Sequence, residues 1–291
     1  MHIQLIPEKG NFFNSRVQIL VVCFLILSLS IFLYLQNNLI VISHIEYASD
    51  KLPPAFDECK ILQISDLHNK QFGKNQARLI KKISSIAPDI IVITGDLVDS
   101  RHTEISKAMG LINRIAGLAP VYYTPGNHEA RNNIYEKIEP LLIASGTHVL
   151  FNRYENFERA NQRIGICGLA DPNFLFSQNY EQQLHENLNE LAAESKAQFN
   201  ILLAHDPALH KIYDRPEFAL VLSGHAHGGQ FRIPFRRGLY APGQGLFPKY
   251  TSGLHQLTHT SMVISRGLGN SAFPLRLFNL PELVVVTLKS S

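Results

Sequence analysis

The sequence predicts an α/β fold preceded by one apolar helix near the N-terminus. From about residue 60 onward, short apolar runs typical of buried strands alternate with longer segments that repeat apolar residues at helical spacing. Residues 17–35 contain no charged side chain. The chain of 291 residues is 45% hydrophobic and 18% charged, an ordinary composition for a protein with a sizeable core. Its net charge of +3, without a long basic run, gives no sign of nucleic-acid binding.

The apolar segment 17–35 is the first element. As a helix rising ~1.5 Å per residue, its 19 residues approach the ~30 Å thickness of the hydrocarbon core of a bilayer. A cleaved signal peptide is the alternative, with Ser43 as a small residue at which cleavage could occur. Signal peptides usually have an apolar core of only ~7–15 residues, so an uncleaved membrane anchor is the preferred interpretation.

Basic residues around this segment predict its orientation. Lys9 and Arg16 precede it, whereas the nearest basic residue after it is Lys51. Because basic residues favour the cytoplasmic side, the N-terminus is expected inside the cell and the rest of the chain outside. We therefore predict a single-pass protein of the cell membrane. Its parts are a cytoplasmic stub with the anchor in 1–41, a tether in 42–56 and one extracytoplasmic domain in 57–291.

The domain starts with a predicted strand at 60–65 and a helix at 75–86, which Pro88 ends. An apolar strand at 89–94 follows, and the alternation then continues to the C-terminus. Further strands are predicted at 121–124, 163–169, 199–204, 219–223, 257–266 and 283–288, and further helices at 104–116, 132–144 and 181–194.

Five polar clusters each follow one of these strands. Ligands of α/β sheets gather at the carboxyl ends of strands, so clusters far apart in sequence can converge there. Gly95, Gly126 and Gly224 permit sharp turns directly after the strands. The clusters are Asp66-Leu67-His68, Gly95-Asp96, Gly126-Asn127-His128-Glu129, His205-Asp206 and Gly224-His225-Ala226-His227.

Each cluster alone has a structural explanation. A Gly-Asp pair is often a turn, Asn127 could cap a helix with Glu129 in its first turn, and His205 could be a hydrogen-bonded structural residue. The occurrence of all five in order, each after a strand, favours a shared site instead. Carboxylate, carboxamide and imidazole ligands suit Mn²⁺, Fe or Zn²⁺, and the absence of cysteine from the clusters argues against a structural zinc site.

These motifs resemble the calcineurin-like metallophosphoesterase superfamily, whose pattern is D-x-H, G-D-x-x-D, G-N-H-[ED], a later His and G-H-x-H. The resemblance covers roughly residues 60–291 and implies a four-layer α/β/β/α sandwich of two mixed sheets. The DLHN start, the GHAHGGQ turn and the PGQGLFPKYTSG stretch resemble a bacterial branch of membrane-anchored or exported members. Some relatives of that branch are phosphodiesterases or UDP-2,3-diacylglucosamine pyrophosphohydrolases.

The resemblance also implies roles for single residues. His128 would lie beside the leaving group as general acid or charge stabiliser, and Asp99 would orient it. A helix cap or a surface residue is the alternative for Asp99. Ser100 separates Asp99 from Arg101, whereas some protein-phosphatase relatives have Arg directly after this Asp, so a protein-phosphatase interpretation is weakened. The implied ligands are Asp66, His68 and His227 for a first metal, Asn127, His205 and His225 for a second, and Asp96 as the bridge between them.

The segment 228–254 follows the last histidine motif and mixes aromatic and basic side chains with many Gly and Pro residues. It is predicted to be an irregular loop bordering the site, with a packed surface loop whose charges are merely solvated as the alternative. Arginines could meet a phosphate, and aromatic side chains could meet acyl or prenyl chains. The residues predicted to contact substrate are Phe231, Arg232, Phe235 and Arg236.

Together these patterns predict a membrane-anchored, metal-dependent phosphoester hydrolase. The expected cofactors are two divalent transition-metal ions, Mn²⁺ by preference with Fe or Zn²⁺ as alternatives. The predicted substrate is a lipid-linked or nucleotide-lipid phosphodiester or pyrophosphate, such as a molecule like UDP-2,3-diacylglucosamine. A general phosphodiesterase or phosphomonoesterase on soluble substrates, and a non-catalytic metal-stabilised interaction domain, are the alternatives. Neither a nucleic-acid partner nor an obligate protein partner is expected.

Overall fold

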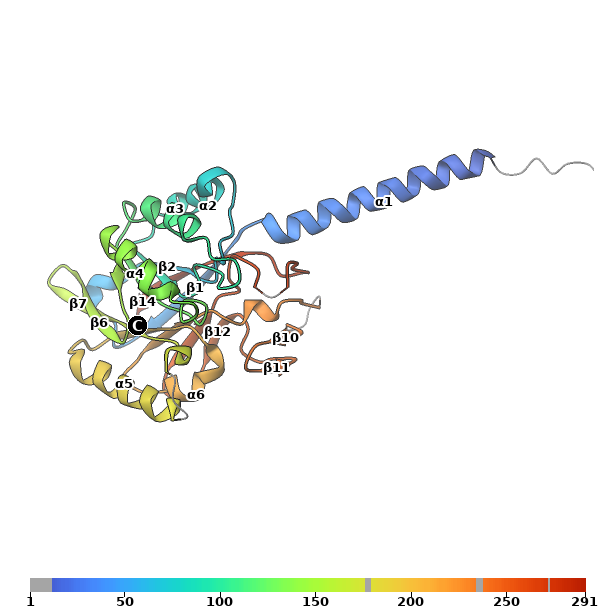
Figure 1. The fold of residues 1–291 in the computed structure, drawn as a ribbon. Coiled ribbons are helices and arrows are strands. Elements are labelled where there is room, and N and C mark those ends of the chain that lie inside the picture. Colours follow the sequence, from blue (N-terminus) through green and yellow to red (C-terminus); the bar gives the residue numbers. More distant parts are fainter. Residues whose placement is uncertain (1–11, 176–178, 234–237, 272) are drawn as a thin grey trace, which may run out of the picture.

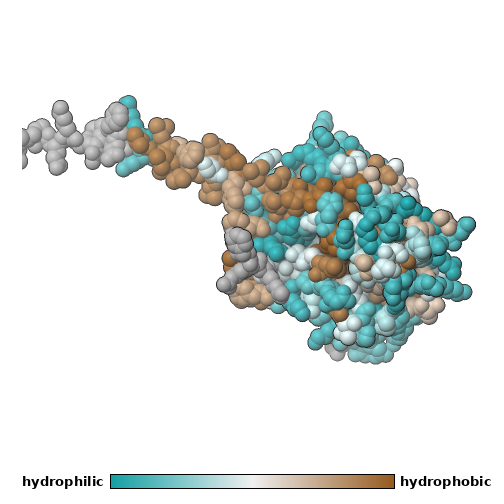
Figure 2. All heavy atoms as spheres, turned by 180° about the vertical axis from the view of Figure 1, so that it is seen from behind, coloured by the Kyte–Doolittle hydropathy of each residue, from teal (hydrophilic) through white to brown (hydrophobic). Residues whose placement is uncertain are grey.

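A long helix leads into a layered α/β domain in the computed structural model, which describes residues 12–175, 179–233, 238–271 and 273–291 (Figure 1). The helix, α1 (Phe12–Asn38), contains the whole predicted apolar segment 17–35. Most of its large apolar side chains are exposed, and Figure 2 shows the helix as a hydrophobic rod standing away from the domain. Its length and composition are sufficient to cross a membrane.

Two mixed six-stranded sheets form the centre of the domain. In the first sheet, β14 is antiparallel to β2 and parallel to β1, and the remaining neighbours are parallel. In the second sheet, both edge strands are antiparallel to their neighbours. The first sheet has the order β1 (Val41–Ser49), β14 (Glu282–Ser290), β2 (Lys60–Ile64), β3 (Ile90–Thr94), β4 (Val121–Thr124) and β5 (His148–Val149), and the second has the order β12 (Gly253–Gln256), β13 (Ser261–Ile264), β9 (Leu220–Ser223), β8 (Asn200–Ala204), β7 (Gln162–Leu169) and β6 (Arg153–Arg159).

Alternating side chains of the strands build the layers. In β3, Ile90 and Val92 pack in the core between the sheets, whereas Ile91 and Ile93 pack against helices. A strand covered on both faces is apolar at every position, which explains the continuous run in the sequence. Figure 1 shows helices on opposite outer faces, as in the predicted four-layer sandwich. The first sheet is covered by α2 (Ala77–Ile86), α3 (Ile105–Ile115) and α4 (Ile134–Ala144), and the second by α5 (Tyr180–Glu194) and α6 (His210–Tyr213).

The segment predicted to be a tether, 42–56, is part of the domain, and that prediction is wrong. Most of it belongs to β1, which pairs with β14 in register from Val41↔Glu282 to Ser49↔Ser290. Phe56 is fully buried in the core between the sheets. The partner strand lies at the other end of the chain, so no local pattern marks this pairing. Only two residues, Leu39 and Ile40, therefore separate α1 from the sheet.

Smaller differences concern the second sheet and the loop beside it. The predicted strand 257–266 shortens to β13, and a turn closed by the Leu257 amide and the Thr260 carbonyl joins it to β12. No strand is predicted where β6 and β12 lie. The segment 228–254 is mainly irregular within the described residues, as predicted. It also contains a small hairpin of β10 (Tyr240–Ala241) and β11 (Gly245–Leu246).

Candidate metal centre

The predicted ligands lie directly beyond strand ends of both sheets. Asp66 and Asp96 stand two residues after β2 and β3, His205 follows β8 at once, and His225 stands two residues after β9. β2, β3 and β4 run parallel to one another, as do β8 and β9, so within each sheet their carboxyl ends share an edge. The two edges meet, because Nδ1 of His205 lies 2.6 Å from the carbonyl oxygen of Thr94 at the end of β3.

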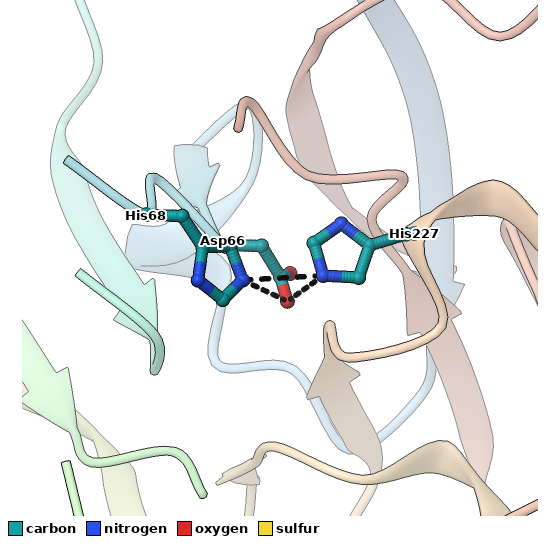
Figure 3. A group of neighbouring side chains, drawn as sticks. All are labelled: Asp66, His68 and His227. Carbon is teal, nitrogen blue, oxygen red and sulfur yellow. Dashed lines mark hydrogen bonds and ion pairs between the residues drawn. The ribbon is translucent and has the colours of Figure 1, made fainter. Parts of the chain in front are cut away.

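Asp66, His68 and His227 form a first cluster and point toward one another (Figure 3). The Nε2 atoms of His68 and His227 lie 3.2 Å apart. Oδ1 of Asp66 lies 3.9 Å from the first of these nitrogens and 3.5 Å from the second. Burial lowers the pKa of His68 to about 3. Its imidazole is therefore neutral and has a lone pair available for a metal ion.

Asp96, His205 and His225 form a second cluster, which Asn127 joins. Oδ2 of Asp96 lies 3.2 Å from Nε2 of His205. Nδ1 of His225 and Oδ1 of Asn127 each lie 3.2 Å from the same nitrogen. A carboxylate, a carboxamide and two imidazoles therefore converge, and these are the side chains predicted for the second metal.

Asp96 faces both clusters. Its Oδ2 lies 3.2 Å from Nε2 of His205 and 3.5 Å from Nε2 of His68. Its Oδ1 accepts a hydrogen bond of 2.9 Å from the backbone amide of His128, which fixes the carboxylate plane. Burial acts to raise the pKa of Asp96, but the neighbouring His205 outweighs it and the pKa lies well below its ordinary value. An ionised carboxylate in this position could be shared by two metal ions.

The chemistry of these side chains fits divalent cations. Because the Thr94 carbonyl accepts from Nδ1 of His205, the Nε2 lone pair of a neutral His205 faces the acceptor oxygens of Asp96 and Asn127. Buried acceptors that converge in this way need a positive charge among them. The pKa of His205 also indicates a site for positive charge. Burial acts to lower this pKa, but Asp96 and Asp66 raise it well above its ordinary value, so the surroundings attract a proton or a metal ion.

Buried groups around the clusters fix the ligand loops. Glu129 is fully buried, and its Oε2 accepts hydrogen bonds from the amides of Asp96 and Gly126, at 2.9 and 2.8 Å. A Cβ atom at Gly126 would collide with the Asp96 carboxylate, and one at Gly224 would collide with that of Asp66. Close approach of the loops thus requires both glycines. Glu129 had no predicted role in the site, although its place in the GNHE motif was a usable signal.

The backbone at the ligands is unusual. Five of the seven predicted ligands have positive φ angles, between 44° and 60°. This left-handed conformation is uncommon for residues other than glycine and persists only where the surroundings impose it. The folded loops therefore hold the ligand side chains against a local backbone preference. The five residues are Asp66, His68, Asp96, His225 and His227.

His128 presents a hydrogen-bond donor beside the clusters. Its ring lies 4.6 Å from that of His68. Its Nδ1 accepts a hydrogen bond of 2.9 Å from the backbone amide of Ser100, so the proton of the neutral ring is on Nε2. Burial lowers the pKa of His128, which favours that neutral form. Nε2 lies 3.5 Å from Oγ of Ser271, at the wall of the cavity described below.

Asp99 does not orient His128 through a hydrogen bond, as the resemblance implied. Its Oδ1 lies 3.8 Å from Nδ1 of His128, and Ser100 occupies the hydrogen-bonding position at that nitrogen. The carboxylate instead forms a bidentate pair with Arg101, at 3.0 Å to Nε and 2.6 Å to Nη2. Its Oδ2 lies 3.7 Å from Nδ1 of His68. Asp99 therefore positions an arginine at the edge of the site.

A cavity of about 450 Å³ opens over the two clusters. Arg101 and Arg131 line it together with the polar Gln230, and Tyr240 and Phe273 add aromatic surface. Arg101 follows the Gly95-Asp-x-x-Asp99 motif, and Gln230 is the last residue of the GHAHGGQ turn, so the sequence marks both. The other three residues belong to no local chemical motif.

The two described residues that were predicted to contact substrate do not line this cavity. Phe231 packs its ring 4.9 Å from that of Phe273 and does not itself line the cavity. Arg232 donates to Oγ of Ser252 at 2.9 Å and also lies outside the lining. Phe235 and Arg236 lie outside the described residues.

Comparisons with known proteins agree with this site. The sequence pattern of the family described as calcineurin-like phosphoesterase matches residues 59–229. An uncharacterized metallophosphoesterase of Bacillus subtilis, YkuE, is 33% identical over 267 residues, covering 89% of this chain and 88% of that protein. An uncharacterized metallophosphoesterase of Campylobacter jejuni is 30% identical over 295 residues, covering 99% of this chain and 74% of that protein. A transmembrane protein with a metallophosphoesterase domain from Danio rerio is 27% identical over 258 residues, covering 85% of this chain and 57% of that protein.

The chain belongs to the calcineurin-like phosphoesterase family, whose pattern matches more than half of it. It is therefore a hydrolase that acts on phosphoesters, and its buried ligand clusters provide a candidate site for divalent metal. The predicted superfamily and the predicted sandwich fold are confirmed. The apolar helix α1, together with relatives named as transmembrane proteins, suggests a membrane anchor.

Proposed function

We propose that the protein is a two-metal phosphodiesterase or pyrophosphohydrolase, anchored by α1, that cleaves a lipid-linked or nucleotide-lipid phosphate. One observation carries the proposal. Two ligand clusters share Asp96, which lines a cavity that also has the aromatic side chains of Tyr240 and Phe273 in its wall.

The proposed ligand sets are those of the two clusters. Mn²⁺ is the preferred ion, with Fe or Zn²⁺ as alternatives, because the ligands are oxygens and imidazole nitrogens. When bound, two such ions would supply a hydroxide at neutral pH and a positive clamp on the phosphoryl oxygens. Asp66, His68 and His227 would hold the first ion, Asn127, His205 and His225 the second, and Asp96 both.

Protein side chains would orient the ester and stabilise its charge. His128 would donate its Nε2 proton in a hydrogen bond to the leaving-group oxygen, where negative charge develops. Arg101 and Arg131 would attract the phosphate at the cavity wall, and Asp99 would hold the Arg101 guanidinium in place. This division of roles needs no hydrogen bond between Asp99 and His128.

The lipid part of the substrate is supported by the apolar side of the cavity. Tyr240 and Phe273 line it, yet they are 52% and 46% exposed, so they lie where the cavity meets the solvent. Apolar side chains in that place could contact acyl or prenyl chains while the phosphate reaches the metal ligands. A membrane anchor would keep such a substrate close to the site.

A comparison of acylated and deacylated substrates tests the proposal. We would measure kcat/KM of full-length protein in lipid nanodiscs with Mn²⁺, for UDP-2,3-diacylglucosamine and UDP-glucosamine. We expect the wild type to prefer the acylated substrate, and a Tyr240→Ser/Phe273→Ser variant to lose that preference. Ile143→Ser, a matched change at an exposed apolar residue of α4, should keep it.

Other outcomes select the alternatives. Equal kcat/KM for both substrates in the wild type would reject lipid specificity and favour a general phosphodiesterase. Failure to cleave any diester, pyrophosphate or monoester when metal is bound would favour a non-catalytic interaction domain.

The extracytoplasmic placement of the domain is part of the proposal. It is supported by the basic residues before the apolar segment 17–35, of which Arg16 is described and Lys9 lies outside the described residues. Protease added to intact cells, with the outer membrane permeabilised where one is present, should digest the domain. Its protection under those conditions would reverse the orientation.

A further inference from the structure

Five large apolar side chains are exposed on two loops beside the metal cavity. Leu246 and Phe247 are 69% and 68% exposed, and Phe273, Leu275 and Phe278 are 46%, 37% and 51% exposed. We call these five residues the apolar rim. Single apolar side chains are common on protein surfaces, whereas a group of this kind marks a contact surface.

Main-chain hydrogen bonds join the two loops into one surface. The amide of Phe247 donates to the carbonyl of Leu239 at 2.9 Å, and the amide of Leu239 donates to that of Phe231 at 2.8 Å. The neighbouring amide of Arg232 donates to the carbonyl of Leu277 at 3.0 Å. The rim residues are thus carried by one bonded framework.

Two aromatic residues of the rim are held in a strained conformation. Phe247 has a φ angle of 53° and Phe278 one of 52°. A left-handed backbone is exceptional for a bulky residue, and such strain is concentrated at sites of contact and function. Both side chains remain exposed, so their burial within the domain does not explain the strain.

The end of α1 is fixed to the second of these loops. Oδ1 of Asn37 accepts hydrogen bonds from Nδ2 of Asn270 at 2.9 Å and from the amide of Arg276 at 3.2 Å. Asn37 is buried, and the ring of Phe32 lies 5.6 Å from that of Phe278. The helix is therefore bonded to the segment that carries three of the rim residues.

The position of Phe32 sets the depth of the rim. It lies inside the apolar segment 17–35, three residues or about 4.5 Å before the end of that segment. Its contact places Phe278 level with the edge of the hydrocarbon layer that the segment would span. Figure 1 shows β10, β11 and the loop that precedes β14 on the side from which α1 leaves, and Figure 2 shows hydrophobic residues continuing from the helix onto the domain.

We propose that the apolar rim is a membrane-contacting surface, which enters the same leaflet in which α1 ends and holds the mouth of the metal cavity against the bilayer. The inference rests on the anchoring by α1 proposed above and is independent of catalysis. Phe273 belongs both to the rim and to the cavity lining, so contact of the rim would bring the cavity to the lipid surface.

The side chains of the apolar rim are suited to contact with a lipid surface. Its side chains are aromatic or aliphatic, and Lys249, two residues beyond Phe247, is exposed and could pair with anionic headgroups. The surrounding loops have main-chain polar groups outside regular structure, so insertion would be shallow and limited to the boundary of headgroups and acyl chains.

Tryptophan fluorescence provides a direct test, because the chain contains no tryptophan. Single substitutions Phe247→Trp and Phe278→Trp would be made in the full chain, with Leu25→Trp in α1 and Ile143→Trp on α4 as references. Each protein would be reconstituted in phosphatidylethanolamine–phosphatidylglycerol vesicles with plain or brominated acyl chains. We expect both rim reporters to be quenched by brominated lipid, approaching the loss seen for Leu25→Trp, and Ile143→Trp to be unaffected.

Each outcome is decisive. Rim reporters that emit like Ile143→Trp, while Leu25→Trp is quenched, would show an anchored protein whose rim does not touch lipid. Rim emission shifted to the blue without quenching by lipid would show that protein covers the rim, and would also overturn the proposal. An unquenched Leu25→Trp would reject the anchor itself, and thereby the proposal, without bearing on the metal site.

Discussion

The carboxylate of Glu129 accepts a hydrogen bond of 2.9 Å from the backbone amide of Asp96. The same oxygen accepts from the amide of Gly126, and the second oxygen accepts from that of Val98 at 3.2 Å. One buried side chain thus fixes the loop that carries the shared carboxylate relative to the loop that carries Asn127. Both proposed metal positions depend on this arrangement.

Glu129→Gln should weaken metal binding without removing a ligand. A carboxamide places an NH₂ group where a carboxylate oxygen now faces backbone donors, so at least one buried amide loses its acceptor at a cost of about 1–3 kcal/mol. We expect a lower midpoint in denaturant and weaker binding of both ions, measured by unfolding and by titration with Mn²⁺. Glu136→Gln, at an exposed residue of the following helix α4, is the control, and indistinguishable behaviour of the two variants would contradict the role of Glu129.

Asp96→Asn should lower the occupancy of both metal positions. Oδ2 of Asp96 is the described carboxylate oxygen that faces His68 and His205 together, and asparagine lacks the charge to bind two cations. Elemental analysis of the wild type should give close to two transition-metal ions per chain, and the variant should hold clearly fewer. Asp206→Asn alters a cavity residue that belongs to neither proposed ligand set, so this variant should keep both ions. Full occupancy in Asp96→Asn would rule out the shared ligand.

His128→Ala should retain metal and lose activity. The substitution removes the Nε2 donor but no residue of either ligand set, so kcat should fall roughly 10²–10⁴-fold. The loss should be smaller for a p-nitrophenyl ester than for an alkyl ester. The p-nitrophenolate leaving group stabilises its own negative charge and therefore gains less from a proton donor. His102→Ala, at an exposed histidine nearby, should behave like the wild type. Equal losses for both esters would show that His128 does not act on the leaving group.

The parts of the fold and site that could be predicted are those that depend on local sequence patterns. The apolar run of β3 shows that it is covered on both faces, and the polar residues after it could be predicted as ligands because strand ends gather at one edge. Asp66, Asp96 and His205 could each be placed this way without knowledge of their partners. The four-layer arrangement itself came from the resemblance of the motifs, since strand spacing alone does not distinguish one sheet from two.

The rest depends on contacts between distant parts of the chain. β1 could not be separated from a tether, because its pairing with β14 is not visible in its own sequence. The resemblance gave Asp99 the role of orienting His128, but the backbone amide of Ser100 donates to Nδ1 of His128 and Asp99 pairs with Arg101. Nothing in the sequence predicts that Arg276 is buried, since its burial follows from the folded loops around it.

Arg276→Lys should affect the first metal position more than the second. The Arg276 side chain is 1% exposed, and its guanidinium donates to the carbonyls of Arg266 and Gly269 and to Oδ1 of Asn270. Its Nη2 also lies 3.4 Å from Nδ1 of His227, a member of the first cluster. Burial lowers the pKa of Arg276 to about 10, so it stays charged at neutral pH. A lysine cannot reproduce this fork of donors, and the loop beside His227 should loosen.

Titration of the metal-free protein with Mn²⁺ should therefore show weaker binding at one position and nearly unchanged binding at the other. Arg215→Lys, at an arginine that bonds Asn189 and Glu217 away from both clusters, provides the matched control. Equal weakening of both positions would indicate a general loss of stability, and no weakening would remove Arg276 from the support of the site. Asn37 accepts from the backbone amide of Arg276 and from Nδ2 of Asn270, and the side-chain change removes neither donor. Quenching of the Phe278→Trp reporter in an Arg276→Lys background should consequently persist even where the first metal position is weakened, which separates support of the metal ligand from attachment of the helix.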